Sequence, residues 1–209
     1  MATISNENLG LIKDLYYNKF YSARKIAQKF KVSIDAVYYF MRHYGLKRRT
    51  FSEENKLRFD NKKPSFSIKK TLSESEKELK VLGTILYWGE GYKTRKSSGI
   101  DFVNCDPGMI TVFLSFLRRI CGVQESKLRV LLYCYSNQNV NKLVDFWNKT
   151  TKISKAQFTR PYIKNDFNVY KVDKMPYGLV HIRYGDKKLL LLIKKWIDNY
   201  KEKYGYLKN

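Results

Sequence analysis

The 209-residue chain has little of what small secreted, fibrous or zinc-stabilised proteins depend on, with only 3 cysteines, 4 prolines, 11 glycines and 2 histidines. The scarcity of glycine and proline excludes collagen-like and low-complexity classes. Cys105, Cys121 and Cys134 are odd in number and lack metal-ligand spacing, so we expect buried thiols in a reducing compartment. With two histidines and no CxxC pair, a structural zinc site is not expected.

Long apolar runs and nucleotide-binding loops are missing too. The longest apolar run, from Leu189 to Ile193, lies between lysines and is far shorter than the roughly 20 residues that cross a bilayer, so no membrane partner is expected. The N-terminal residues show neither a basic n-region nor an apolar h-region, which predicts a cytoplasmic location. No GxxxxGK[ST] or GxGxxG motif occurs, which argues against a nucleotide cofactor.

What the chain has in excess is positive charge. It carries 41 Lys and Arg against 19 Asp and Glu, a net charge of +22, on a composition that is 44% hydrophobic and 29% charged. The composition is that of a folded protein. Such a charge, together with 17 tyrosines and 12 phenylalanines, indicates a polyanionic partner. A solvated surface on a lysine-rich protein is the alternative, and the motifs must decide.

Residues 1–49 have the pattern of a small helical unit. A first helix over residues 8–17 places Leu11, Ile12, Leu15 and Tyr16 on one face. Ser22 and Ser33 are N-caps of two further short helices, and Gly45 ends the second. The segment 22–46, SARKIAQKFKVSIDAVYYFMRHYGL, closely resembles the helix-turn-helix of resolvase-like and regulator DNA-binding domains.

This resemblance implies that the second helix of the pair enters the major groove. Its outer face and cap would contact DNA through Ser33, Ile34, Asp35, Tyr38, Tyr39, Arg42 and His43. Phosphates would dock at Arg24 and Lys25, and on the basic tail Lys47, Arg48 and Arg49. A three-helix protein-interaction module is the other interpretation of the same pattern.

Residues 50–72 are polar, show no sustained period and contain the helix-interrupting Lys62-Lys63-Pro64. We interpret them as a basic linker, whose positive side chains are Lys56, Arg58, Lys62, Lys63, Lys69 and Lys70. The linker either follows a phosphate backbone or is simply solvated.

Residues 73–209 alternate between helical and extended patterns. Ser73 and Glu76 form a capping box before an apolar helix that ends at Gly89-Glu90-Gly91. Helices are further predicted after Asp106-Pro107, over Asn139–Thr150 and over Lys187–Tyr204, with Trp88, Trp147 and Trp196 in the core. Predicted strands are Tyr92–Lys96, Ile100–Asn104, Leu128–Tyr135, Gln157–Ile163 and Gly178–Tyr184. His181, in the middle of the last strand, is expected to be packed or at the surface.

The first of these helices, with the run LGTILYWGEG over residues 82–91, resembles the motif of LAGLIDADG homing endonucleases. In that family two such helices pack side by side, each ending in an acidic residue and a glycine, which here are Glu90 and Gly91. The resemblance implies an α+β fold in which an antiparallel sheet lies on DNA. In this chain Lys93, Arg95, Lys96 and Asn104 would make contacts there.

The same resemblance implies phosphodiester hydrolysis with Mg²⁺, because a carboxylate from each helix supplies oxygen ligands. Glu90 is therefore the predicted catalytic and metal-binding residue, and the basic Lys187 and Lys188 near the last helix are predicted to act beside it. Only one copy of the motif is present, so cleavage of both strands requires a homodimer through the helix of residues 73–91.

Two functions follow for a protein that binds double-stranded DNA at the nucleoid. The first is a site-specific homing endonuclease, favoured by the Gly-Glu-Gly end of the helix. The second is a transcriptional regulator whose LAGLIDADG-like domain is catalytically inactive, favoured by the single motif and the bulky Tyr87 and Trp88. A recombination accessory protein is a third reading. Both main hypotheses predict DNA binding that weakens steeply with salt.

Overall fold

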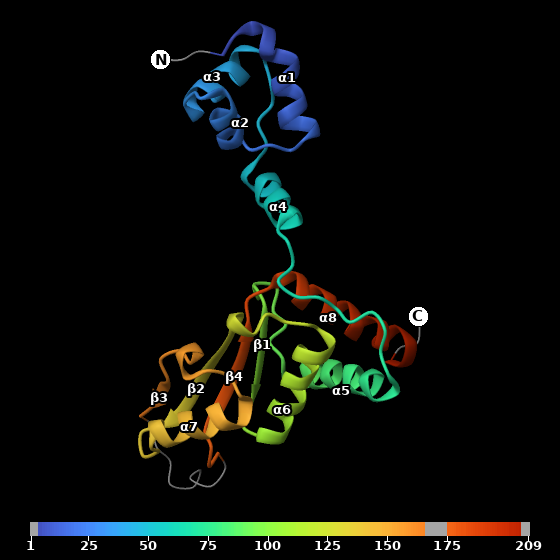
Figure 1. The fold of residues 1–209 in the computed structure, drawn as a ribbon, viewed down its shortest axis with the longest axis vertical. Helices are drawn as coiled ribbons and strands as arrows, with labels where there is room; N and C mark the ends of the chain where they lie inside the picture. Colours follow the sequence, from blue (N-terminus) through green and yellow to red (C-terminus); the bar gives the residue numbers. More distant parts are fainter. Residues whose placement is uncertain (1–3, 166–174, 206–209) are drawn as a thin grey trace. The chain divides into compact units, whose positions relative to one another are not determined.

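The computed structural model describes residues 4–165 and 175–205 of the chain. The chain divides into two compact units, Met1–Lys63 and Pro64–Asn209 (Figure 1). Helices and a mixed four-stranded sheet make up the fold, which is of the α+β class. Within these residues no helix is long and apolar enough to span a bilayer.

The first unit is helical. Its elements are η1 (Asn6–Asn8), α1 (Leu9–Lys13), η2 (Asp14–Asn18), α2 (Ala23–Phe30), α3 (Ile34–His43) and α4 (Phe51–Asn61). Ile12, Leu15 and Tyr16 are buried as predicted, but Leu11 is 42% exposed. The prediction for Leu11 is wrong because the core formed with α2 and α3 covers only the other three positions.

The helix α4 lies where the sequence shows no apolar period. Thr50 and Glu53 form a complete capping box, with the Thr50 hydroxyl accepting from the Glu53 amide and the Glu53 carboxylate accepting from the Thr50 amide. The helix buries none of its residues. The basic linker predicted over residues 50–72 therefore contains a helix, and the boundary between the two compact units falls after Lys63.

The second unit contains α5 (Glu74–Glu90), β1 (Ile100–Asn104), α6 (Pro107–Ser115), η3 (Phe116–Ile120), η4 (Glu125–Lys127), β2 (Leu128–Tyr135), α7 (Val140–Thr151), η5 (Lys155–Gln157), β3 (Tyr162–Lys164), β4 (Leu179–Tyr184), α8 (Lys187–Tyr200) and η7 (Lys201–Gly205). The predicted caps Ser73, Asp106 and Asn139 are all confirmed. Before α5, residues Phe66, Ile68 and Leu72 pack against the core of this unit, and Ser65 donates to the Asp186 carboxylate that caps α8.

The strand order in the sheet is β1-β4-β2-β3. The pairs β1/β4 and β4/β2 are antiparallel, whereas β2 and β3 are parallel. The expectation of an antiparallel sheet is thus wrong at one edge, because α7 acts as a crossover that brings the chain back in the same direction. The strand predicted over Tyr92–Lys96 is also wrong, since only Gly91 forms a bridge, with Phe102. Of the predicted strand Gln157–Ile163, only its end is included in β3.

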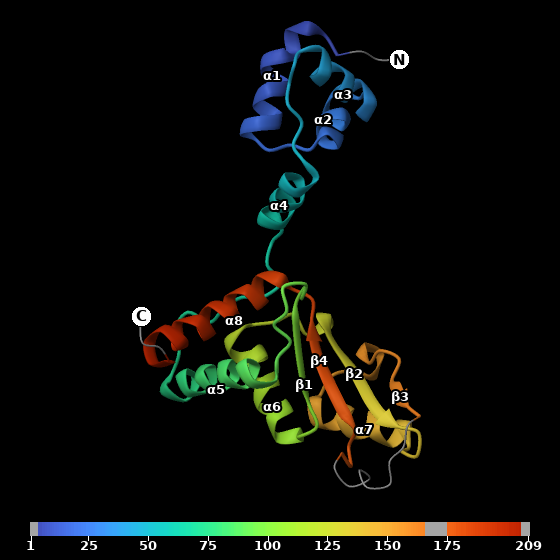
Figure 2. The same ribbon diagram turned by 180° about the vertical axis from the view of Figure 1, so that it is seen from behind.

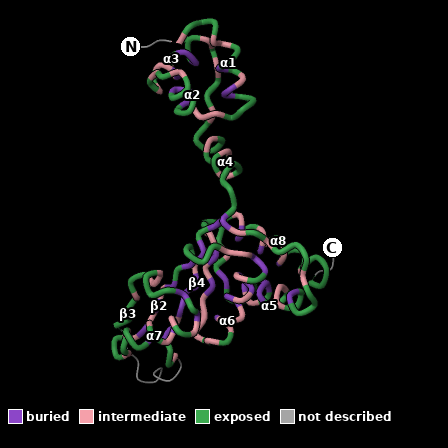
Figure 3. The backbone as a smooth tube through the Cα atoms, viewed as in Figure 1, coloured by how far each residue is buried: buried purple, intermediate pink, exposed green. Residues whose placement is uncertain are grey.

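Alternation along the strands gives the sheet two different faces. One face buries Ile100, Phe102, Val130 and Ile182, among others, against a core that α6, α7 and α8 complete (Figures 2 and 3). The residues between them point the opposite way. We call this the second face, and it consists of Asp101, Val103, Arg129, Leu131, Tyr133, Leu179, His181 and Arg183.

The helix α5 packs closely against the core at Gly83. A Cβ at Gly83 would lie 2.1 Å from the side chain of Phe116, which is fully buried in η3. Trp88, predicted to be in the core, is instead 37% exposed. The apolar period of α5 therefore does not show which side of the helix packs inward, and Gly83 marks that side.

We expect Gly83→Ala to lower the free energy of unfolding of this unit by about 1–3 kcal/mol, because Phe116 must be displaced in a packed core. This loss exceeds the roughly 1 kcal/mol that alanine gains over glycine in a helix. Gly89→Ala is the matched control, since a Cβ there meets nothing within 4 Å. Urea unfolding followed by tryptophan fluorescence measures both, and equal stabilisation by the two substitutions would contradict the packing role of Gly83.

Candidate nucleic-acid interface

The helix pair α2 and α3 is fixed by local hydrogen bonds. The Ser22 hydroxyl accepts from the Lys25 amide at 3.2 Å, and the Ser33 hydroxyl accepts from the Ala36 amide at 3.1 Å. Between the helices Lys31 adopts a left-handed conformation with φ 53°, which ends α2 and turns the chain. Ala27 and Val37 are buried where the helices cross. The sequence therefore determines both caps and the turn.

On α3, four of the predicted contact residues are exposed, namely Asp35, Tyr39, Arg42 and His43. Tyr39 is 65% exposed, and its ring is stacked on His43 with centroids 6.2 Å apart. Ile34 and Tyr38 are partly buried against the core of the unit. The outer face of the helix is thus narrower than the sequence suggested, and it carries one acid beside aromatic and basic side chains.

Basic side chains surround this helix pair at the positions expected for phosphate contacts. Arg24 and Lys25 are exposed at the N-terminus of α2, and Lys47 and Arg48 are exposed beyond α3. Arg48 stacks on Tyr38, its guanidinium carbon 3.6 Å from the ring centroid.

Arg49 does not share this exposure, because its side chain is only 11% exposed. Its guanidinium donates to the carbonyls of Tyr16 and Tyr21 and to the Glu54 carboxylate. We correct the prediction that Arg49 contacts DNA, since these three partners hold its donors inside the unit.

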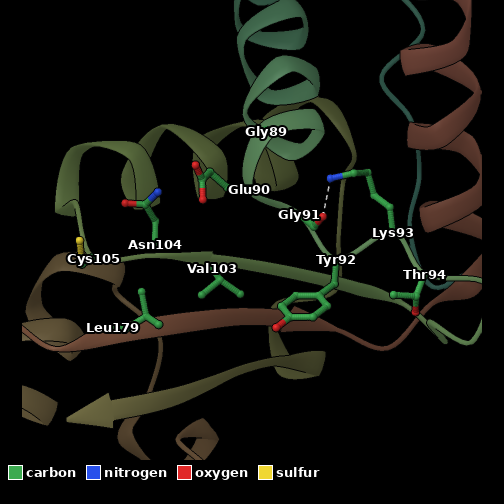
Figure 4. A pocket seen from close by; sticks show the side chains of 10 residues that line it. All are labelled: Gly89, Glu90, Gly91, Tyr92, Lys93, Thr94, Val103, Asn104, Cys105 and Leu179. Atoms are coloured by element: carbon green, nitrogen blue, oxygen red, sulfur yellow. Dashed lines mark hydrogen bonds between the residues drawn. The ribbon is translucent and has the colours of Figure 1, made fainter. Parts of the chain in front are cut away.

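In the second unit, Glu90 lies at the exposed C-terminal end of α5. It lines a concavity of about 740 Å³ together with Asn104, Cys105 and Leu179 (Figure 4). Asn104 reaches this concavity but also accepts a hydrogen bond from the Asp106 amide at 2.8 Å. Among the residues that the structure describes, no three carboxylate, histidine or cysteine groups gather as metal ligands. Glu90 is the carboxylate that these described residues place at the concavity.

Lys93 lies beside Glu90 but is directed at the end of α5. Its ammonium donates to the carbonyl oxygens of Tyr87, Trp88 and Gly91 at 3.3, 2.8 and 2.5 Å. Burial lowers the pKa of Lys93, and the Glu90 carboxylate opposes this effect. The ammonium of Lys93 thus compensates the negative end of the helix dipole.

Lys187 and Lys188 are not brought to Glu90. They follow the last residue of β4, whereas Leu179, the first residue of β4, lines the Glu90 concavity. A six-residue strand spans about 17 Å, so the two lysines lie at the other end of the sheet. The prediction that they act beside Glu90 is wrong, because α8 begins where β4 ends. Arg95 and Lys96 are exposed in the turn before β1.

Sequence reasoning missed a polar cluster on the second face. The Asp101 carboxylate contacts His181 Nδ1 through one oxygen and accepts from Arg183 Nε through the other, both at 2.9 Å. The His181 ring is buried between Tyr133 and Tyr92, with centroids at 4.7 and 6.2 Å. Alternation in the two strands places all three residues on one face, but only the register of β1 with β4 joins them.

Comparison with protein-family models, with curated proteins and with solved structures gives no match.

Proposed function

We propose that this chain is a sequence-specific binding protein for double-stranded DNA. The observation that carries the proposal is the pair α2 and α3, in which two serine-capped helices present a polar and aromatic outer face flanked by exposed basic residues. A helix of this size fits the major groove, and cations at its borders neutralise phosphates. The net charge of +22 agrees with a polyanionic ligand.

The second unit adds another DNA contact in this proposal. Its second face carries Arg129 and Arg183 directly opposite each other across β2 and β4. Asp101 compensates the charge of Arg183, whereas Arg129 has no carboxylate partner among the residues that the structure describes, so the two arginines leave this face with net positive charge. The exposed Arg95 and Lys96 lie before β1 and extend the positive surface. Nucleic acid supplies both phosphates and base edges to such a surface.

We propose further that the protein is a Mg²⁺-dependent double-strand endonuclease of the LAGLIDADG homing type. Glu90 would hold the metal, which supplies Lewis-acid activation of the phosphate and a hydroxide nucleophile. Among the residues that the structure describes, Glu90 is the carboxylate that lines this concavity, and in this proposal the second carboxylate comes from another copy. The donor type fits Mg²⁺, which takes carboxylate oxygens together with phosphate oxygens.

A second copy has a suitable surface on α5. Its side away from Gly83 exposes an apolar stripe, defined as Val81, Leu82, Ile85 and Trp88, with exposed fractions of 42, 54, 45 and 37%. The stripe ends at Gly89 and Glu90, so helix-to-helix packing of two copies brings both carboxylates to one place. Gly89, which has open space where a Cβ would be, permits that approach. A homodimer through α5 would therefore complete the site.

The regulator hypothesis keeps one observation in its favour. Lys93 already compensates the end of α5, so the exposed Glu90 needs no metal ion for its charge to be tolerated there. In this alternative the second unit binds DNA or dimerises without cleaving. The two functions share DNA binding and differ in whether Mg²⁺ produces cuts.

The DNA-binding proposal is tested by the salt dependence of affinity. We expect the association constant for duplex DNA to fall linearly with salt on a double-logarithmic plot. Arg24→Gln should reduce the steepness of this slope by about one and weaken all sequences alike, because it removes one phosphate contact. Lys19→Gln changes the charge equally but removes a lysine that is paired with Asp14 at 2.7 Å, so its slope should match the wild type. Binding that is insensitive to salt would refute the proposal.

A further inference from the structure

The polar cluster on the second face holds one arginine in a fixed orientation at the surface. Arg183 uses its Nε to donate to Asp101, and its side chain remains 40% exposed. Its terminal nitrogens Nη1 and Nη2 have no hydrogen-bond partner among the residues that the structure describes. A guanidinium fixed through Nε keeps these two parallel donor groups free, which is the geometry of bidentate recognition.

Two residues in series hold Arg183 in this orientation, first Asp101 and then His181. Asp101 is itself held through its other oxygen by His181 Nδ1, and His181 is buried against Tyr133. The side chains of Arg183 and Asp101 are 40% and 23% exposed, and ion pairs at the surface typically add about 0–1 kcal/mol to stability. An aspartate and a histidine that together hold one exposed guanidinium are therefore better explained by what the guanidinium binds than by folding energy.

The position favours a base edge over a phosphate. Arg183 lies on β4, an interior strand of the sheet, rather than at an edge where a duplex backbone would pass. The Asp101 carboxylate, 2.9 Å from Arg183 Nε, repels a phosphate but not the neutral edge of a base. Guanine presents O6 and N7 as two adjacent acceptors in the major groove, and arginine is the side chain that most often contacts both.

We propose that Arg183, positioned by Asp101 and His181, reads one guanine in the DNA target of the second unit. This inference rests on the proposed DNA binding and adds a specificity-determining residue to it. Arg129, its neighbour on β2, donates through Nη1 to the carbonyls of Ser126 and Leu128, and no carboxylate among the described residues holds it. The two arginines are therefore expected to differ in what they recognise.

The test is selection of bound sequences from a random duplex pool with the full chain. We expect the wild-type target to contain a guanine whose preference disappears in Arg183→Lys, with affinity for the wild-type target about 5- to 100-fold weaker. The salt slope should stay unchanged because lysine keeps the charge. Asp101→Asn, which keeps the arginine but removes the carboxylate, should weaken the preference at the same position.

Arg118→Lys is the matched control, because Arg118 is likewise held by a carboxylate, that of Glu125, but belongs to η3 and not to the second face, so this change should leave every base preference in place. Tryptophan fluorescence unfolding confirms that each variant is folded. If Arg183→Lys retains all base preferences, or loses affinity equally for all sequences, the assignment of guanine is wrong while the DNA-binding proposal stands. If the wild-type chain selects no sequence and does not bind duplex DNA, the proposed function itself fails, and this inference fails with it.

Discussion

Glu90→Gln is expected to lower the rate of Mg²⁺-dependent DNA cleavage by about 100-fold or more, without weakening DNA binding. Among the described residues, Glu90 is the acidic side chain that lines the concavity at the end of α5, and glutamine keeps its size while losing the charge that binds a divalent ion. A metal ion contributes several kcal/mol to stabilising the charge that develops on a transferring phosphate, and each 1.36 kcal/mol is tenfold in rate.

The direction in which Glu90→Gln changes DNA affinity distinguishes a metal-binding role of Glu90 from a structural role. Glu90 is exposed and bears negative charge, so its neutralisation should leave DNA affinity in EDTA equal or slightly higher. Cleavage of DNA from the native locus and of a random duplex library, with Mg²⁺ or EDTA, measures the activity. Cuts by the wild type that persist in Glu90→Gln would remove Glu90 from the site. Sequence-selective binding by the wild type without any cuts would support the regulator instead.

Co-expression of the two forms tests whether two copies share one site. If each double-strand cut needs a carboxylate from both copies, an equal mixture of wild type and Glu90→Gln contains about one quarter fully competent dimers. Double-strand cleavage should then fall to about that fraction. A fall to only one half would show that each copy acts by itself, which contradicts a dimer through the apolar stripe of α5.

Much of the fold could be predicted from local signals. The capping residues Ser73 and Asp106 fix where α5 and α6 begin, and the alternation of Leu128–Tyr135 is that of β2. The helix α4 shows the limit of this reasoning. It buries no residue and so leaves no apolar period, and its capping box at Thr50 and Glu53 is the only sequence signal for it.

The site was less predictable because it depends on contacts between distant residues. Asp101 and His181 are 80 residues apart, and their hydrogen bond follows from the register of β1 with β4. Only the topology of the resemblance places Lys187 and Lys188 beside Glu90. Their position in the structure depends on which end of β4 leads into α8. The apolar residues of α5 lie on several sides, so the sequence could not separate its packed side from its exposed stripe.

Arg49 illustrates the same limit among three consecutive basic residues. Lys47, Arg48 and Arg49 are equivalent in the sequence, but only Arg49 meets the carbonyls of Tyr16 and Tyr21, 33 and 28 residues away. Its backbone amide also donates to the Tyr16 hydroxyl at 2.9 Å, and its guanidinium carbon lies 3.9 Å from the centre of that ring. Arg49 therefore links the chain after α3 to η2.

We expect Arg49→Met to lower the free energy of unfolding of the first unit by about 3–5 kcal/mol. Methionine fills a similar volume, but it leaves two carbonyls and the Glu54 carboxylate without the hydrogen bonds that Arg49 donates to them. A unit of this length has a total stability of about 3–9 kcal/mol, so the loss is comparable with the whole. The variant should lose helix content in the first unit, and with it the DNA binding that we propose for α3.

The two units can be followed separately because Trp88, Trp147 and Trp196 all lie in the second one. Far-ultraviolet circular dichroism reports helix in both units, whereas tryptophan fluorescence reports the second unit alone. Arg49→Met should shift the first signal and leave the second unchanged. Arg48→Met is the matched control, since Arg48 is exposed and stacks on one ring, a contact worth about 0.5–1 kcal/mol. Equal shifts for the two variants would mean that Arg49 does not hold the unit together.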